Sequence, residues 1–205
     1  VEFAFGGAGI NHHHGTPWNP WDLQEHRLPG GSSSGSGVAV SSGLTSAALG
    51  TDTGGSVRIP ASFDGLVGLK PTFGRVSNAG VVPLDSTLDS VGPMTRSVGD
   101  AALLYDVIRG PDGEDAATLE QPIEGPSDDL NLDLTGVRLC VPREYFWEDV
   151  DAETEAAVRA TAQVFAELGA NVDEISLEPL DRLLEMRQRS AAAGLTVGTL
   201  SSVET

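Results

Sequence analysis

Short apolar runs in the first half of the chain alternate with segments rich in glycine, serine and proline. The run VAVSSGLTSAALGTD predicts a short helix over residues 36–42 and a buried strand over 47–51. FDGLVGLKPT contains another short apolar run, which Pro71 ends. VGDAALLYDVIRG has apolar residues at helical spacing and predicts a helix, with Asp100 near its start and Gly110 just past its end.

The second half of the chain has one strong helical pattern between two strand-like runs. VRLCVP, residues 137–142, predicts a fully buried strand, and NVDEISL, residues 171–177, predicts another strand. Between them, DAETEAAVRATAQVFAELGANV predicts an amphipathic helix that Asp151 caps and Gly169 ends. The expected apolar face of this helix consists of Ala157, Thr161, Val164, Phe165 and Leu168. Helices that alternate with short apolar strands predict an α/β layered domain.

The composition indicates a globular protein with an acidic surface. With 205 residues, 40% of them hydrophobic and 20% charged, the chain is long enough for one ordinary domain with a core. Its net charge of −18 means that neither nucleic acid nor an anionic membrane is an expected partner. The single cysteine, Cys140, excludes an internal disulfide, indicates a reducing, cytoplasmic compartment, and is expected to be a buried apolar group. No apolar run reaches the roughly 18 residues that a membrane-spanning helix needs.

Two neighbouring stretches concentrate glycine and serine: PGGSSSGSG, residues 29–37, and GTDTGGSVRIP, residues 50–60. A flexible linker is the usual interpretation of such composition, but core-like runs flank both stretches closely. A phosphate cradle would need the Lys-Ser/Thr pair of a P-loop or the spacing of a dinucleotide fingerprint, and neither is present. The remaining interpretation is a serine nucleophile.

The simplest form of a serine nucleophile is the G-x-S-x-G elbow, which GSSSG satisfies with Ser33 in the middle. An α/β-hydrolase places its histidine after the serine, whereas all four histidines precede Ser33. They are His12, His13, His14 and His26. A serine can also work without histidine when a neutral lysine is the general base.

The segment from residue 30 to 72, GGSSSGSGVAVSSGLTSAALGTDTGGSVRIPASFDGLVGLKPT, resembles the signature segment of the amidase signature family. NHHHGTPWNPWD before it and FGRVSNAGVVPLDSTLDSVGPMTRSVGDAALLYDVIRG after it extend the resemblance. The resemblance implies a layered α/β/α domain around a mixed, mostly parallel sheet, of which the chain would be an interior fragment. Residues 1–110 would form the signature core with the catalytic serines, 111–135 an acidic connection, and 136–205 a helix-rich continuation.

The resemblance also implies the roles of individual residues. Ser56 corresponds to the acylated nucleophile, and Ser32 to a bridging serine held by a cis peptide. Asp52 and Arg58 would organise the loop between them. The oxyanion hole would be formed by the backbone amides of Thr53, Gly54, Gly55 and Ser56.

The third catalytic residue of the family is a lysine upstream of the glycine-serine stretch. We expect it to lie outside this chain, which begins at VEFAFGG without a methionine. Lys70, the only lysine, is expected to support a strand end, because a residue before proline is held extended. Asp64 stands where the family commonly has a small residue or cysteine, and a carboxylate near a buried strand needs a polar partner. The adjacent histidines 12–14 are expected to be structural, since consecutive loop residues rarely converge on one metal ion.

The expected function is hydrolysis of a small carboxamide substrate through an acyl-enzyme on Ser56, with no metal or organic cofactor. One alternative is the glutamine-hydrolysing A subunit of a tRNA-dependent amidotransferase. The other is a non-catalytic homologue. A homodimer is a possible assembly, and amidotransferase subunits would be the partners under the first alternative.

Overall fold

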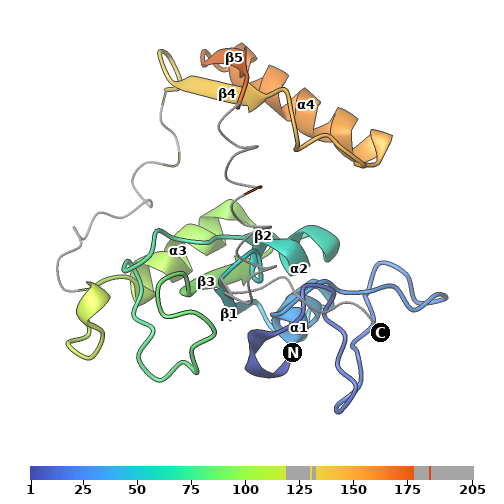
Figure 1. Cartoon of the computed structure of the whole chain (residues 1–205), viewed down its shortest axis with the longest axis vertical. Helices are drawn as coiled ribbons and strands as arrows, with labels where there is room; N and C mark the ends of the chain where they lie inside the picture. Colours follow the sequence, from blue (N-terminus) through green and yellow to red (C-terminus); the bar gives the residue numbers. More distant parts are fainter. Residues whose placement is uncertain (119–129, 131–132, 178–184, 186–205) are drawn as a thin grey trace. The chain divides into compact units, whose positions relative to one another are not determined.

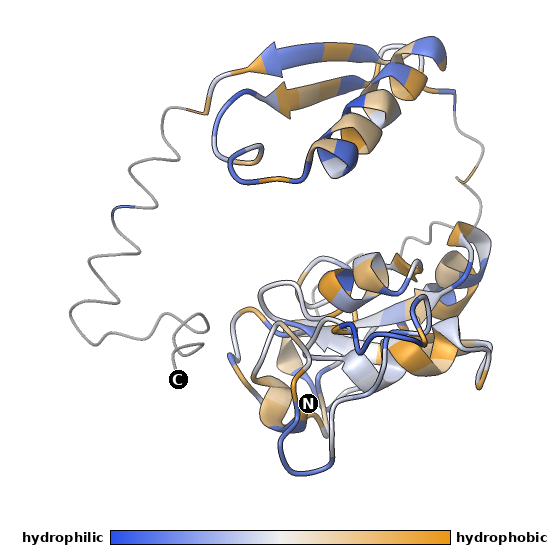
Figure 2. Ribbon diagram, turned by 90° about the vertical axis from the view of Figure 1, so that its right-hand side faces the viewer, coloured by the Kyte–Doolittle hydropathy of each residue, from blue (hydrophilic) through white to orange (hydrophobic). Residues whose placement is uncertain are grey.

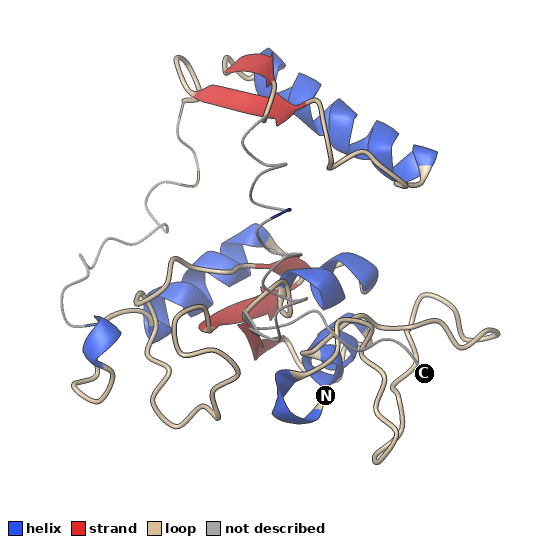
Figure 3. Cartoon of the chain, viewed as in Figure 1, coloured by secondary structure: helices blue, strands red, loops and turns tan. Residues whose placement is uncertain are grey.

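A computed structural model describes residues 1–118, 130, 133–177 and 185. The chain divides into two compact units: residues 1–130 lie in the first, and the second begins at Asn131. Figure 3 shows that both units combine helices with strands, as the α/β expectation requires. Within the described residues, no helix is both long and apolar enough to cross a membrane.

A three-stranded sheet forms the centre of the first unit, in the order β1-β3-β2 (Figure 1). The middle strand, β3 (Ser90–Thr95), is buried along its whole length. It pairs antiparallel with β1 (Ala47–Asp52) and with β2 (Val67–Gly68). The strand expected at 47–51 is confirmed as β1, but the expected burial is wrong, because within β1 only Asp52 is buried. The sequence analysis missed β3.

Three helices pack on this sheet: α1 (Ser34–Ser41) contacts β1 and β3, α2 (Arg58–Phe63) contacts β2, and α3 (Val98–Ile108) contacts β3 and β2. The helix expected at 36–42 is α1, which begins two residues earlier. Two short 3₁₀ turns, η1 and η2, cover Glu2–Ala4 and Ala116–Thr118.

The start of α3 is fixed by a local cap that the sequence analysis did not name. Ser97 stands just before the helix, and its Oγ accepts a hydrogen bond from the Asp100 backbone N at 3.1 Å. An acidic residue in the first turn also interacts favourably with the positive end of the helix. Gly110 follows the last helical turn, so both predicted ends of α3 are confirmed.

The two faces of β3 contribute to separate hydrophobic clusters. Met94 packs with Val57 and Ala61 at α2, whereas Val91 packs with Tyr105 of α3. Because side chains alternate along a strand, residues 91 and 94 point to opposite faces of the sheet. Helices therefore cover both faces, which gives the layered α/β/α arrangement.

The second unit is a β-α-β motif. Strand β4 (Arg138–Pro142) and strand β5 (Asn171–Ile175) pair in parallel, and α4 (Ala152–Glu167) connects them. Asp151 caps α4, because its side chain accepts hydrogen bonds from the backbone amides of Glu153 and Thr154. Gly169 follows the end of the helix with φ +100°. Both expected ends of α4 are confirmed. Pairing is thus antiparallel throughout the sheet of the first unit and parallel in that of the second. The expected predominance of parallel pairing is not found among the described strands.

Burial in the second unit differs from the expectation. Strand β4 is only partly buried and Cys140 is exposed. Among the described elements of this unit, α4 is the only helix. None of the α4 residues is buried either, including Phe165, which is 39% exposed. An open groove of about 710 Å³ runs between these elements. Figure 2 shows hydrophobic and hydrophilic residues interspersed along α4 and both strands.

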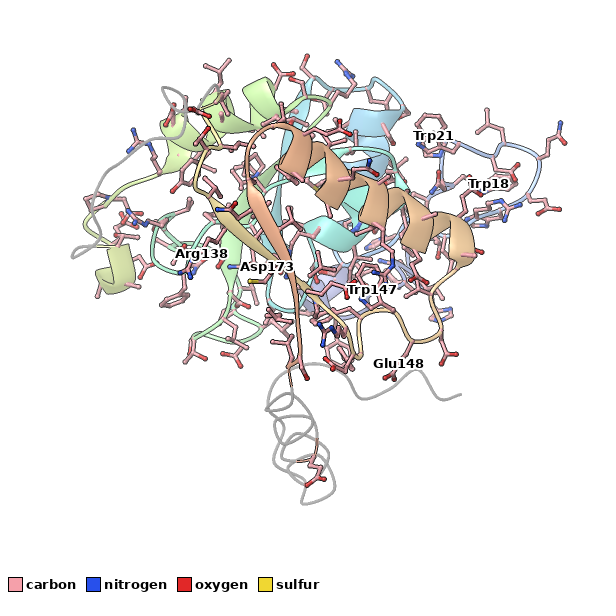
Figure 4. The ribbon with its side chains drawn as sticks, turned by 90° about the horizontal axis from the view of Figure 1, so that it is seen from above. Trp18, Trp21, Arg138, Trp147, Glu148 and Asp173 are labelled. Carbon is pink, nitrogen blue, oxygen red and sulfur yellow. The ribbon has the colours of Figure 1, made fainter. Side chains whose placement is uncertain are left out.

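A cation-π contact joins the loop after β4 to α4. The Arg159 guanidinium lies 4.1 Å from the centre of the Trp147 ring, which is labelled in Figure 4. Arg159 also pairs with Glu155 one turn earlier, at 2.7 Å. A cation-π contact at an exposed site contributes about 0.5–1 kcal/mol.

The expected acidic connection is described only in part. Its first residues, from Pro111 to Glu114, are exposed, in agreement with a solvated loop. Residues 119–129 and 131–132 of that connection lie outside the described residues, as do 178–184 and 186–205 of the expected helix-rich continuation.

Candidate active site

Serine side chains at the start of α1 form hydrogen bonds to the backbone of β1. The Ser33 hydroxyl accepts a hydrogen bond from the Thr51 backbone N at 3.2 Å and donates one to the Thr51 carbonyl at 3.3 Å. The Ser36 hydroxyl donates to the Leu49 carbonyl at 2.8 Å. The Ser33 hydroxyl thus uses both its donor and its acceptor capacity on the backbone of Thr51. These bonds give Ser33 a structural role and do not favour the interpretation as a nucleophile elbow.

The two serines that the resemblance marks as catalytic lie on adjoining segments. The Gly31–Ser32 peptide is cis, as the resemblance implies. The next residue, Ser33, donates its backbone N–H to the carbonyl of Ser56 at 3.2 Å, which joins the two segments directly. Ser32 is 3% exposed, whereas Ser56 is only partly buried. The segment of the partly exposed Ser56 therefore adjoins the segment of the buried Ser32.

Gly31 allows this segment to approach the start of the chain closely. A Cβ at Gly31 would lie 2.2 Å from the Gly6 carbonyl oxygen and 2.7 Å from the Gly9 backbone N. Neither of these backbone atoms can move aside as the end of a side chain could. A residue larger than glycine would therefore displace the segment that carries Ser32.

Asp52, at the end of β1, organises the loop that carries Ser56. Its carboxylate is fully buried and accepts backbone hydrogen bonds from Gly55 at 2.8 Å and Val57 at 3.1 Å. The Arg58 side chain donates two more, both at 3.0 Å, in a bidentate pair. Burial raises the pKa of the Asp52 carboxyl, but the hydrogen bonds from Arg58 and Val57, with the Arg58 charge, hold it below its ordinary value. The expected role of Asp52 and Arg58 in organising the loop agrees with this geometry.

The Gly55 amide has a different partner from the one expected. It donates to Asp52, so in this geometry it does not face an oxyanion. Gly55 has φ +134°, and a Cβ there would lie 2.7 Å from Cδ1 of Ile59, so glycine suits this turn. Three amides of the expected hole form no hydrogen bond with the described part of the chain: those of Thr53, Gly54 and Ser56.

A contact between Thr53 and Asp89 was missed by the sequence analysis. The Thr53 hydroxyl donates to one carboxylate oxygen of Asp89, which is only 4% exposed. The other Asp89 oxygen accepts from the backbone N of Leu84 at 2.8 Å and of Asp85 at 3.1 Å. Asp89 directly precedes β3, so this contact holds the loop before Ser56 against the central strand. No local signal in the sequence pairs residues 36 positions apart.

A cavity of about 500 Å³ opens beside Ser32. The lining includes the serine together with the apolar side chains of Leu49, Val82 and Val91. Ser56 is not among the residues that line this cavity.

Lys70 lies at a strand end, as expected. Its Nζ donates to the Pro71 carbonyl at 2.7 Å and approaches the Ser90 hydroxyl at 3.5 Å, across the junction of β2 and β3. These contacts give Lys70 a supporting role at the sheet.

Asp64 lacks the polar partner that its position calls for. The side chain is fully buried, and within the described residues neither carboxylate oxygen forms a hydrogen bond. Burial raises the pKa of Asp64 to about 7.

Comparison with known proteins identifies the family. Residues 1–198 match the Amidase family, and the chain therefore belongs to the amidase signature family, with its mixed α/β fold. The chain is 48% identical over 176 residues to the A subunit of the glutamyl-tRNA(Gln) amidotransferase of Chromohalobacter salexigens, covering 86% of the chain and 36% of that protein. It is 44% identical over 193 residues to 2-amino-5-chloromuconic acid deaminase of Comamonas testosteroni, covering 94% of the chain and 39% of that protein.

A solved structure supports the same conclusion. The A subunit of the glutamyl-tRNA(Gln) amidotransferase of Thermotoga maritima matches with a TM-score of 0.85 and 38% identity, over 95% of this chain and 42% of that one. The chain therefore spans about two fifths of the length of the relatives that it matches.

Proposed function

We propose that this chain supplies the nucleophile of an amide hydrolase, with Ser56 attacking a carboxamide carbonyl to form an acyl-enzyme. The observation that carries the proposal is the junction of the two serine segments. The backbone hydrogen bond from Ser33 to the Ser56 carbonyl joins the segment of the partly exposed Ser56 to that of the buried Ser32, which supports the proposal. The Asp52 carboxylate holds the intervening loop through backbone amides and Arg58. A nucleophile needs such fixed surroundings, because small displacements of reacting groups reduce rates strongly.

In the proposed reaction, a proton moves from the Ser56 hydroxyl to Ser32, and the Ser32 proton moves to a neutral base. The amidase signature family uses a lysine for this base. The Ser56 oxygen bonds to the carbonyl carbon, and the resulting oxyanion accepts hydrogen bonds from the free amides of Thr53, Gly54 and Ser56. One such donor typically lowers the barrier by about 2.7–4 kcal/mol. The C–N bond then breaks, the relay returns a proton to the departing nitrogen, and water releases the acid from Ser56.

The substrate has two candidate forms. In the first, the enzyme acts alone on a small amide. In the second, the substrate is glutamine and the chain belongs to the A subunit of a tRNA-dependent amidotransferase. The 48% identity to one such protein favours this second candidate.

Ammonia release by the longest natural form of the protein tests both candidates. Glutamine and hexanamide serve as the two substrates, and Ser56→Ala is compared with Ser42→Ala, an exposed serine at the far end of α1 whose hydroxyl donates to the Val38 carbonyl. We expect Ser56→Ala to lower kcat by at least about three orders of magnitude, and Ser42→Ala to retain most activity. Undiminished turnover by Ser56→Ala would refute the proposal, and absent turnover by the wild type would favour a non-catalytic homologue. Preference for glutamine or for hexanamide separates the two candidates.

A further inference from the structure

Three side chains that commonly bind metal ions lie together in the first unit: Glu2, His13 and His14. Their potential ligand atoms all lie within 4.8 Å of one another, and all three side chains are exposed. His14 Nε2 is 3.1 Å from Glu2 Oε1. The two imidazole rings meet edge to face, with centroids 4.5 Å apart. The turn thus brings two consecutive histidines together, which the sequence alone did not indicate.

The backbone beneath these histidines is fixed by hydrogen bonds. The Asn11 side-chain oxygen accepts from the backbone N of His13 at 2.9 Å and of His14 at 2.8 Å. The Asn11 backbone N donates to the Thr16 hydroxyl at 3.0 Å. Because the loop is already folded, a bound ion would need to order only the side chains, and this lowers the entropy cost of binding.

We propose that Glu2, His13 and His14 form a binding site for a divalent transition-metal ion of the zinc class. Imidazole nitrogen and carboxylate oxygen together suit zinc, and imidazole also suits copper and nickel. Zinc lies about 2.0–2.2 Å from such ligands, so donors in a tetrahedral site are roughly 3.3–3.5 Å apart. Rotation of exposed side chains closes the remaining distance. Three protein ligands leave a fourth position for water.

Two further observations support the site. The net charge of −18 raises the local concentration of cations around the protein. The ion would also join η1 to the loop at residues 11–14, and the segment between them packs on Gly31 through Gly6 and Gly9. The site therefore acts as a cross-link within the segment that abuts Ser32.

Isothermal titration of the longest natural form of the protein, untagged and EDTA-treated, with zinc chloride tests the proposal. The exposed thiol of Cys140 could bind zinc independently, so the titrations use a Cys140→Ser background. The variants are Glu2→Gln, His13→Ala and His14→Ala. His26→Ala is the matched control, because His26 is exposed and stacks on Trp18 at 4.6 Å.

We expect one zinc ion per chain, with affinity reduced at least about tenfold in each of the three variants and unchanged in His26→Ala. Matching circular dichroism spectra of the metal-free variants establish that loss of a ligand, and not misfolding, weakens binding. Absence of saturable zinc binding to the wild type would overturn the proposal. So would equal affinities of His13→Ala, His14→Ala and His26→Ala.

Discussion

Replacement of Asp64 by asparagine should change how the stability of the first unit depends on pH. Asp64 follows α2 and is fully buried, and its oxygens form no hydrogen bonds with the described residues. A Cβ placed on Gly37 would lie only 2.3 Å from Asp64 Oδ2, so the carboxyl packs tightly against α1. Burial raises the pKa of Asp64 from 3.8 to about 7. The folded state therefore retains a proton that the unfolded chain loses.

The size of the effect follows from the pKa difference between the two states. Below pH 3.8 the carboxyl is protonated in both states, and its ionisation costs the folded state nothing. Between 3.8 and about 7 only the unfolded chain ionises, so the free energy of unfolding falls by about 1.36 kcal/mol per pH unit. Over about three units, the loss is about 4 kcal/mol, and above the folded pKa it is constant. The unpaired amide of Asp64→Asn carries its own cost of about 1–3 kcal/mol, which does not depend on pH.

The measurement is the unfolding free energy of wild type and Asp64→Asn in urea, from about pH 4 to pH 8. Unfolding is followed by tryptophan fluorescence. Trp21 reports on the surroundings of Asp64, because its indole N–H donates to the Asp64 backbone carbonyl at 2.8 Å. We expect the difference between variant and wild type to rise by about 4 kcal/mol in favour of the variant as pH increases. The control Glu114→Gln changes an exposed carboxyl and should show no such rise. If the difference in unfolding free energy between Asp64→Asn and wild type did not change with pH, the reasoning would be refuted.

Two other substitutions test the loop before Ser56. Thr53→Val removes the hydrogen bond to Asp89 and should lower kcat about tenfold, with a smaller change in KM, in steady-state kinetics of the longest natural form. Unchanged kcat would exclude a positioning role for this bond. Asp52→Asn should lower the unfolding free energy by about 2–3 kcal/mol at neutral pH, because it loses the charge-assisted bonds from Arg58. The difference in unfolding free energy between wild type and Asp52→Asn should vanish as the pH falls through the lowered pKa of Asp52. A difference that persists in strong acid would contradict this prediction.

Elements with local end signals were predicted well from the sequence. Asp151 and Gly169 delimit α4, and α3 begins close to Asp100 and ends before Gly110, because helix ends depend on residues within one turn of the helix. Strand β3 has no comparable signal. Its sequence, SVGPMT, includes glycine and Pro93, which are disfavoured in strands, and its position depends on pairing with β1 and β2.

Burial and long-range contacts were predicted less well. The apolar run with Cys140 indicated a fully buried strand, but burial depends on how many layers cover a sheet, and α4 is the only helix among the described elements of this unit. For the site, the resemblance correctly implied the cis peptide before Ser32. The contacts of Ser33 with Thr51 and of Thr53 with Asp89 join distant segments, so only the folded chain reveals them.

The central claim is that Ser56 is the nucleophile, and mapping of a covalent adduct tests it most directly. The longest natural form would be treated with a fluorophosphonate, digested with trypsin and analysed by mass spectrometry. Cleavage after Arg27 and Arg58 leaves Ser32, Ser33 and Ser56 in one peptide, so fragment ions must assign the modified residue. The proposed mechanism predicts the adduct on Ser56. An adduct on Ser33, with Ser56 unmodified, would contradict it and restore the nucleophile elbow.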